Sequence, residues 1–183
     1  IHNIKFKKNI RNKNTINFII GGPNKYFKFQ QQTQEKILNE IKFLSNDFKV
    51  NVIPSRRTPR GLIEELSKID NENVITFDDL FNPRKYGELL SEGNLQVVTW
   101  DSISMISEAI SSEAGTFLFK FEEKFCPKRY LKFFDKITKL NFAQFYNQNL
   151  KPYEISIDEY NKNLKTKILN KIQSNLRFRS SNA

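Results

Sequence analysis

The chain has 183 residues, 38% of them hydrophobic, which is enough for one domain with a buried core. It holds one cysteine, Cys126, and one histidine, His2, which excludes an intramolecular disulfide, a metal site built on cysteine or histidine, and a Ser-His-Asp triad within the chain. The formal net charge of +10 favours phosphate-rich partners, namely nucleotides, nucleic acid or anionic lipid, although a composition rich in Lys and Asn also serves to solvate the tails.

The apolar pattern predicts strands that alternate with helices after a basic lead-in over residues 1–14. Short apolar runs ended by turn residues predict strands over 15–20, 48–53, 73–77, 95–99 and 116–121. Apolar residues at helical spacing predict helices over 31–46, 60–68, 86–90, 102–111, 127–140 and 157–172. A basic tail follows over 173–183. This alternation is typical of an α/β fold, a Rossmann-like, mostly parallel sheet with helices on both faces.

No apolar run approaches the roughly 20 residues that a membrane-spanning helix needs. No signal peptide is expected, because the basic N-terminal residues are not followed by an apolar segment. We therefore expect a soluble, cytoplasmic protein whose cationic surface contacts the inner face of an anionic membrane peripherally. Because the chain begins with Ile1 instead of Met, we also expect it to be a piece of a longer protein.

The first candidate site is the run Gly21-Gly22-Pro23-Asn24, where the first predicted strand ends. Glycine permits a turn at positive φ and a close approach of a ligand to the main chain. Ligands of open α/β sheets bind at such strand ends, and Lys25 and Lys28 lie near enough in sequence to meet a phosphate. An ordinary tight turn between strand and helix explains the same residues, and the spacing fits neither the dinucleotide fingerprint nor a P-loop.

The second candidate site is Ser55-Arg56-Arg57-Thr58, after the second predicted strand. Two adjacent arginines are costly to bury unpaired, and their fork geometry suits a phosphate or a carboxylate. A solvated loop in which Ser55 or Thr58 caps the next helix is the alternative.

The third candidate site follows the fourth predicted strand. Asp101 or Ser102 can cap the next helix, and the free amides of that helix's first turn could hold a diphosphate. Asp101 itself would repel this anion, so we expect it to cap the helix or brace the loop. Glu108 lies four residues after Ser104, hence on the same helix face, where its carboxylate could accept hydrogen bonds from ribose. A capped core helix with an exposed Glu108 is the alternative.

Two further groups are read as structural. Glu122, Glu123 and Lys124 follow the fifth predicted strand and could line the same crevice, but surface charge is the preferred interpretation. The aromatic residues Tyr130, Phe133 and Phe134 have helical spacing, which favours packing over stacking on a base.

Four motifs of this chain occur in the same order as the motifs of a known family. They are Ile-Gly-Gly-Pro-Asn with Phe-Lys-Phe over residues 19–29, Ser-Arg-Arg-Thr-Pro over 55–59, Asn-Pro at 82–83, and Val-Thr-x-Asp-Ser-Ile-Ser-Met-Ile-Ser-Glu-Ala over 98–109. In this order they resemble the mitochondrial-fission "elongated mitochondria" family, whose many bacterial members are regarded as candidate glycosyltransferases. The resemblance covers roughly residues 15–140.

The resemblance implies a GT-B-like architecture, in which residues 15–172 form the C-terminal, donor-binding domain. By similarity, Gly21 and Gly22 lie near the phosphates of a nucleotide-sugar. Ser102 and Ser104 offer the phosphate site at the helix end, and Glu108 matches the glutamate that contacts the ribose in related sugar transferases. The same comparison puts Arg56 and Arg57 in this crevice.

The resemblance also implies partners. The donor is a nucleotide-sugar, bound as substrate with no further cofactor and no metal, and it is transferred to a cell-envelope or other glycoconjugate acceptor. The missing N-terminal domain would supply the acceptor site and often the catalytic base, so we expect the isolated domain to be inactive and name no catalytic residue here. A non-enzymatic interaction module that retains the fold is the alternative function. Nucleic acid is not an expected partner, because no known nucleic-acid-binding motif is present.

Overall fold

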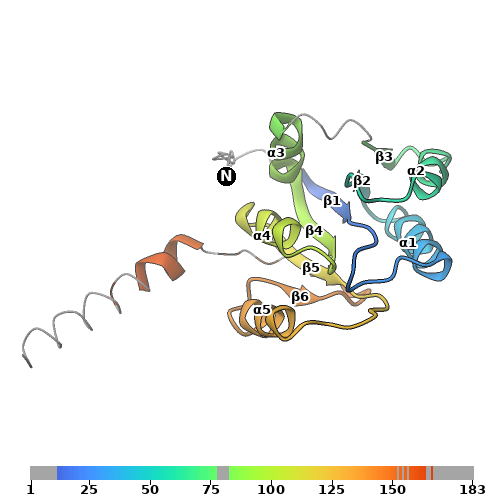
Figure 1. Cartoon of the computed structure of the whole chain (residues 1–183). Coiled ribbons are helices and arrows are strands. Elements are labelled where there is room, and N and C mark those ends of the chain that lie inside the picture. The colour runs from blue at the N-terminus through green and yellow to red at the C-terminus, as the bar shows by residue number, and fades with distance from the viewer. Residues whose placement is uncertain are drawn as a thin grey trace, which may run out of the picture.

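The computed structural model describes residues 12–77, 83–151, 153, 155, 157–163 and 166, in which strands and helices alternate (Figure 1). The strands are β1 (Asn12–Ile20), β2 (Lys49–Pro54), β3 (Val74–Thr76), β4 (Gly93–Thr99), β5 (Gly115–Phe119) and β6 (Gln144–Phe145). The helices are α1 (Gln31–Leu44), α2 (Arg60–Ser67), α3 (Pro83–Glu92), α4 (Ile103–Ser111) and α5 (Lys128–Lys139).

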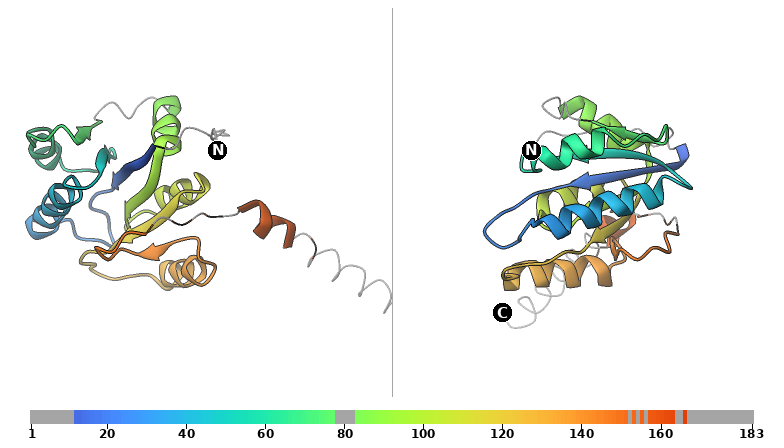
Figure 2. Two further views of the ribbon diagram at one scale, coloured as in Figure 1. Left: turned by 180° about the vertical axis from the view of Figure 1, so that it is seen from behind. Right: turned by 90° about the vertical axis from the view of Figure 1, so that its right-hand side faces the viewer.

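All six strands run parallel in one sheet of order β3-β2-β1-β4-β5-β6. The chain moves outward from β1 to β3, returns through α3 to β4, and then moves outward in the opposite direction. Because crossovers between parallel strands are right-handed, the helices of the two halves cover opposite faces. Figure 1 and Figure 2 show α1 and α2 on one face of the sheet and α3 and α4 on the other. The predicted Rossmann-like parallel sheet is thereby confirmed.

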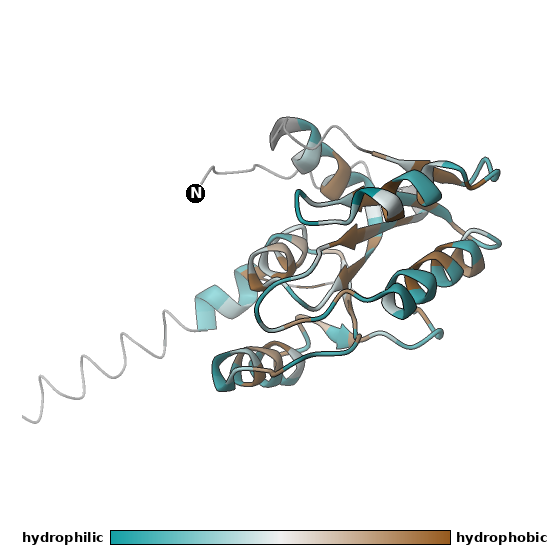
Figure 3. Cartoon of the chain, turned by 45° about the vertical axis from the view of Figure 1, so that its right-hand side comes forward, coloured by the Kyte–Doolittle hydropathy of each residue, from teal (hydrophilic) through white to brown (hydrophobic). Residues whose placement is uncertain are grey.

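The hydrophobic core lies on both faces of the central strands. Their apolar runs are nearly continuous because helices cover both faces. Each helix turns its apolar stripe toward the sheet and its polar side outward, as the hydropathy colouring shows (Figure 3). Strand residues with almost no exposure include Ile16, Phe18, Val52, Val97 and Leu118.

A row of polar side chains crosses this apolar sheet under α3. Asn51, Asn17 and Gln96 pair in register on β2, β1 and β4, and all three are buried. Asn51 Nδ2 donates to Asn17 Oδ1 at 3.0 Å, and Asn17 Nδ2 donates to Gln96 Oε1 at 3.1 Å. Asn17 Nδ2 and Gln96 Nε2 also donate to the carbonyl oxygens of Leu89 (2.7 Å) and Leu90 (2.9 Å). The row therefore satisfies carbonyls in the last turn of α3, which have no partner within the helix.

The aromatic residues of α5 pack inward, as predicted. Tyr130 and Phe134 are buried, and Phe134 stacks on Trp100 with ring centroids 5.5 Å apart. Phe133 is half-buried and meets Phe134 edge to face. Tyr130 also contacts Phe27 and Tyr26, which fixes the first turn of α5 on the loop that follows β1.

The structure corrects several predicted bounds. β1 begins at Asn12, inside the predicted lead-in over 1–14, and α3 is a full helix where the sequence predicts only 86–90. β6 was not predicted; it has two exposed residues and therefore lacks the buried apolar run that indicates a strand. Residues 157–163 are helical, but the remainder of the predicted helix over 157–172 lies outside the described residues except for residue 166, as do the tail over 173–183, residues 1–11 and Asn82.

In the part of the chain that the structure describes, none of the helices has the length and apolar character required to cross a membrane.

Asn17→Ala should destabilise the fold, because it leaves the buried amide of Asn51 and the carbonyl of Leu89 without their partners. The expected loss in the free energy of unfolding is about 2–3 kcal/mol, measured by urea denaturation. Asn14→Ala, at an exposed position of the same strand, is the matched control and should change stability by no more than about 0.5 kcal/mol. Equal losses in the two variants would contradict a structural role for the polar row.

Candidate functional site

The three predicted site segments meet at one edge of the sheet. Ile20 is in register with Pro54, and Ile19 with Val98, so β1, β2 and β4 end side by side. The strand order reverses between β1 and β4, and ligands of open α/β sheets bind at such a reversal. The loops after these three strands carry Gly21 to Asn24, Ser55 to Thr58, and Asp101 to Ser104.

A buried carboxylate, that of Asp101, lies at the centre of this edge. Its side chain is fully shielded from solvent. Oδ2 accepts from Arg57 Nη2 at 2.7 Å and from the backbone N–H of Gly22 at 3.2 Å. Oδ1 accepts from Thr99 Oγ1 at 2.7 Å, and Thr99 Oγ1 in turn accepts from the N–H of Gly21 at 2.7 Å. Asp101 therefore braces the loops, which is one of the two predicted roles.

Arg57 is the cation of this network. Besides its ion pair with Asp101, its Nη1 donates to the carbonyl oxygen of Gly22 at 2.6 Å. Its side chain remains 37% exposed. The predicted preference of the arginine pair for an anion is thus met, at Arg57, by a carboxylate of the same chain.

The two glycines make room for other atoms of the same chain, and this corrects the expectation of a turn at positive φ. Neither Gly21 nor Gly22 has a positive φ. A Cβ atom on Gly21 would collide with the Asp101 carboxylate, and one on Gly22 would collide with the backbone carbonyl of Arg57. These positions therefore require glycine because of close internal approach, not because of turn geometry.

The residues next to the glycines fix the loop after β1. Asn24 Oδ1 accepts from the N–H groups of Tyr26 (2.8 Å) and Phe27 (3.0 Å), and Asn24 Nδ2 donates to the carbonyl oxygen of Asp101 at 3.1 Å. Pro23 is exposed. Asn24 therefore ties the first and third predicted segments together.

Ser55 and Thr58 do not cap α2, in contrast to the alternative interpretation of the second segment. The N-cap residue is Pro59, which has no side-chain oxygen. Thr58 Oγ1 lies 2.8 Å from the Ile20 carbonyl oxygen and 2.7 Å from that of Gly21, and it accepts from the Ser55 N–H at 2.8 Å. Ser55 Oγ accepts from the N–H of Arg57 at 3.2 Å. The Thr58 hydroxyl thus joins the ends of β1 and β2, while the Ser55 hydroxyl fixes the loop after β2.

Helix α4 begins in the third segment, where the sequence predicts a helix N-terminus. Ser102 is the N-cap residue, and its Oγ accepts from the N–H of Met105 at 3.5 Å. The N–H groups of Ile103 and Ser104 have no hydrogen-bond acceptor among the described residues. The two N–H groups that the Ser102 cap leaves over can attract an anion, and the neighbouring Asp101 charge is neutralised by Arg57.

Glu108 is held from two sides. Its Oε1 accepts from Ser104 Oγ at 3.1 Å, which confirms that the two residues share a helix face. Its Oε2 accepts from the hydroxyl of Tyr86, on α3, at 3.1 Å. Burial, followed by the charge of Glu108, raises the pKa of Tyr86 well above its ordinary value. Sequence reasoning missed Tyr86, because only the return crossover through α3 brings it to α4.

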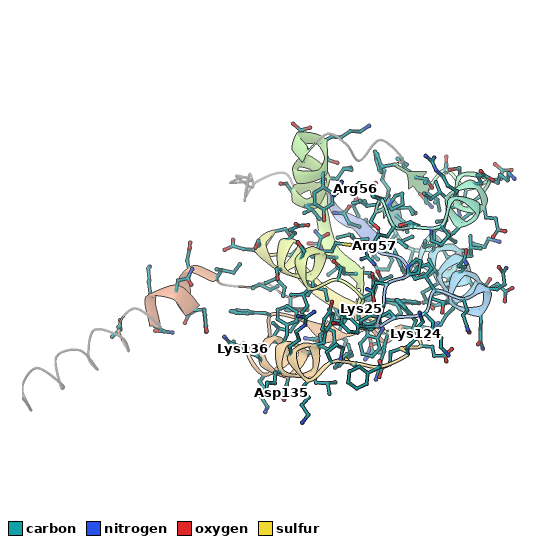
Figure 4. All side chains as sticks on the ribbon, in the orientation of Figure 1. Lys25, Arg56, Arg57, Lys124, Asp135 and Lys136 are labelled. Carbon is teal, nitrogen blue, oxygen red and sulfur yellow. The ribbon has the colours of Figure 1, made fainter. Side chains whose placement is uncertain are left out.

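The remaining cations of this edge differ in their contacts. Lys28 pairs with Glu122 at 2.9 Å, while Lys25 lies over the ring of Tyr26. Arg56 is exposed and forms no hydrogen bond or ion pair with any other described residue. Lys25, Arg56, Arg57 and Lys124 come from the loops that follow β1, β2 and β5 (Figure 4). No group of three His, Cys, Asp or Glu residues suited to a metal ion occurs within the described ranges.

Comparisons with known proteins place this site in context. The family model described as Mitochondrial fission ELM1 matches residues 2–169. The uncharacterized protein RP120 of Rickettsia prowazekii (strain Madrid E) is 27% identical over 140 residues, which cover 72% of this chain and 38% of that relative. The aligned chain thus spans a little over a third of its relative's length. No solved structure matches the chain with significance.

Arg57→Ala should lower the free energy of unfolding by about 3 kcal/mol, because it leaves the buried Asp101 carboxylate without its counter-charge. Arg56→Ala is the matched control, since it removes the same side chain from the neighbouring exposed position; we expect a change within about 0.5 kcal/mol. Urea denaturation of both variants measures the difference. Similar stabilities would show that the Arg57–Asp101 pair does not hold this edge.

Proposed function

This chain belongs to the mitochondrial fission ELM1 family, and we propose that it is the donor-binding half of a glycosyltransferase of GT-B type. The observation that carries the proposal is the first turn of α4, which lies where the strand order reverses. There the N–H groups of Ile103 and Ser104 have no acceptor in the part of the chain that the structure describes. On the same helix face, Ser104 and Glu108 form a polar row that leads away from this anion site. A nucleoside diphosphate presents the matching chemistry, namely phosphates joined to a ribose with free hydroxyls.

Each part of the site has a defined role in this proposal. The N–H groups of Ile103 and Ser104 bind the diphosphate and stabilise the charge that develops on it as the sugar departs. Arg56 is an exposed cation at this edge with no partner among the described residues, so it can turn toward the phosphates. Glu108, oriented by Tyr86, accepts hydrogen bonds from the ribose hydroxyls.

The acceptor and the base that deprotonates it are assigned to the remainder of a longer protein. The match to the Rickettsia relative leaves most of that relative's length uncovered, which is enough for a second domain. In this arrangement a second domain faces the carboxyl edge of the sheet and closes the cleft over the donor.

One observation favours a non-enzymatic interaction module instead. Asp101 and Arg57 occupy the space that the two glycines leave at the strand ends, so these glycines do not admit a ligand to the main chain. In an interaction module the same network would serve only to rigidify the loops. Nucleotide binding distinguishes the two functions.

The proposal predicts that a nucleotide binds the purified chain saturably. Calorimetric titration with UDP, GDP, CMP and ADP, each in a separate experiment, measures this binding. Glu108→Ala should weaken this binding roughly 10- to 100-fold, because a hydrogen bond to a charged group contributes about 1.5–3 kcal/mol. Ser104→Ala should weaken it less. Ser107→Ala is the matched control, since Ser107 is exposed on the same helix and its hydroxyl donates to the carbonyl oxygen of Ile103.

The same titration on the longer protein completes the test. Binding that appears only there would mean that the second domain completes the site. No binding by either protein, or equal binding by the Glu108→Ala and Ser107→Ala variants, would reject the donor-binding role and leave the interaction module.

A further inference from the structure

A cationic surface lies on the segment over residues 124–132, which joins the loop after β5 to the first turns of α5. Its sequence, Lys-Phe-Cys-Pro-Lys-Arg-Tyr-Leu-Lys, contains four basic residues and no acidic one. Lys124, Lys128, Arg129 and Lys132 are all exposed. None of them takes part in an ion pair with a described residue.

The same segment exposes two large apolar side chains among these cations. Phe125 is 64% exposed and Leu131 is 52% exposed, which are the highest values among the large hydrophobic residues that the structure describes. Phe43, by comparison, is 46% exposed on α1. Exposed apolar side chains that lie singly are normal, but two of them in one short basic segment indicate an interaction site.

Backbone hydrogen bonds and aromatic packing fix residues 124–132 on the body of the domain. The N–H groups of Lys124 and Phe125 donate to the carbonyl oxygen of Tyr26, at 2.8 and 3.2 Å. Tyr130, between the exposed residues, is buried against Phe27 and Phe134. Phe125 and Leu131 are therefore presented by a rigid base, and little conformational entropy would be lost when a partner binds them.

Neighbouring charges strengthen the positive field. Arg129 and Lys25 both lie against the ring of Tyr26, at 5.7 and 4.8 Å from its centroid. A hydrogen bond from Lys25 and the charge of Arg129 lower the pKa of the Tyr26 hydroxyl. Of the nearest acidic residues in sequence, Glu122 pairs with Lys28 and Asp135 pairs with Lys139. Glu123 is half-buried, and after burial its charge is the next cause that raises the pKa of Cys126 within the segment.

We propose that residues 124–132 dock this protein on an anionic lipid bilayer, with Phe125 and Leu131 entering the interface between headgroups and acyl chains. Basic side chains gain energy next to anionic headgroups, and apolar side chains gain energy at the acyl boundary. Nucleic acid fits less well, because the aliphatic Leu131 has no flat face on which a base can stack. The inference does not require the proposed glycosyltransferase activity.

The place of the segment in the fold gives this docking an orientation. Residues 124–132 follow β5, so they lie at the same edge of the sheet as the loops that hold Arg56 and Asp101. Docking brings the β5 side of this edge next to the bilayer. If the donor-binding role also holds, the acceptor class is a lipid-anchored molecule.

Vesicle co-sedimentation of the full chain tests the proposal. The wild-type chain should sediment with vesicles made of equal parts phosphatidylglycerol and phosphatidylcholine, and not with vesicles of phosphatidylcholine alone. The double variant Phe125→Ser/Leu131→Ser should bind at least roughly tenfold more weakly. Phe43→Ser, which removes an exposed phenylalanine from α1, is the matched control and should bind like the wild type.

Two double charge-reversal variants distinguish an effect of the charges on this segment from an effect of the protein's net charge. Lys128→Glu/Lys132→Glu should weaken binding at least roughly tenfold. Lys42→Glu/Lys68→Glu changes the net charge by the same amount on α1 and next to α2, and should retain most of the binding. Unchanged thermal unfolding of all variants would establish that each is folded.

Three results would overturn the proposal: no sedimentation of the wild-type chain, equal binding to both vesicle types, or equal binding of the double serine variant and the Phe43→Ser control. Binding of a labelled oligonucleotide through the same residues, without sedimentation, would assign the surface to nucleic acid instead. Because Glu108→Ala should leave sedimentation unchanged, failure here is distinguishable from failure of nucleotide binding.

Discussion

The Asp101 carboxylate is buried where β1, β2 and β4 end, and a buried charge is tolerated only when it is paired and hydrogen-bonded. Its partners come from all three strand ends: the Gly22 N–H after β1, Arg57 after β2, and Thr99 in β4. The loops that follow β1, β2 and β4 are therefore positioned relative to one carboxyl group. The arrangement also sets the electrostatics of the candidate site, because the first turn of α4 can attract an anion only while Arg57 balances the charge of Asp101.

A second polar network lies within the strands of the same sheet, away from their carboxyl ends. The amides of Asn51, Asn17 and Gln96 join β2, β1 and β4 and hold the last turn of α3 through the carbonyls of Leu89 and Leu90. The position of α3 matters for the site because α3 carries Tyr86, whose hydroxyl orients Glu108. The Asp101 network positions the N-terminal end of α4, and the amide network, through Tyr86 on α3, positions Glu108 on the side of α4.

Residues whose role depends on local pattern were predictable from the sequence, whereas those defined by distant partners were not. Short apolar runs such as Phe18 to Ile20 indicate buried strands, and Ser102 is a residue type that favours helix N-termini. The pairing of Arg57 with Asp101 joins residues 44 positions apart, and no local pattern encodes it. The glycine pair was recognised as special, but its cause, close contact with the Asp101 side chain and the Arg57 main chain, requires the folded chain.

The junction between α3 and β4 has a mechanical consequence. Helix α3 ends at Glu92 and β4 begins at Gly93, so no linker residue separates a peripheral helix from a central strand. A shift of α3 along its axis is therefore passed directly to the first residues of β4, where the pairing with β1 is irregular between Asn12 and Ile16. Helix α3, which carries Tyr86, is in this way coupled through the main chain to a central strand of the sheet.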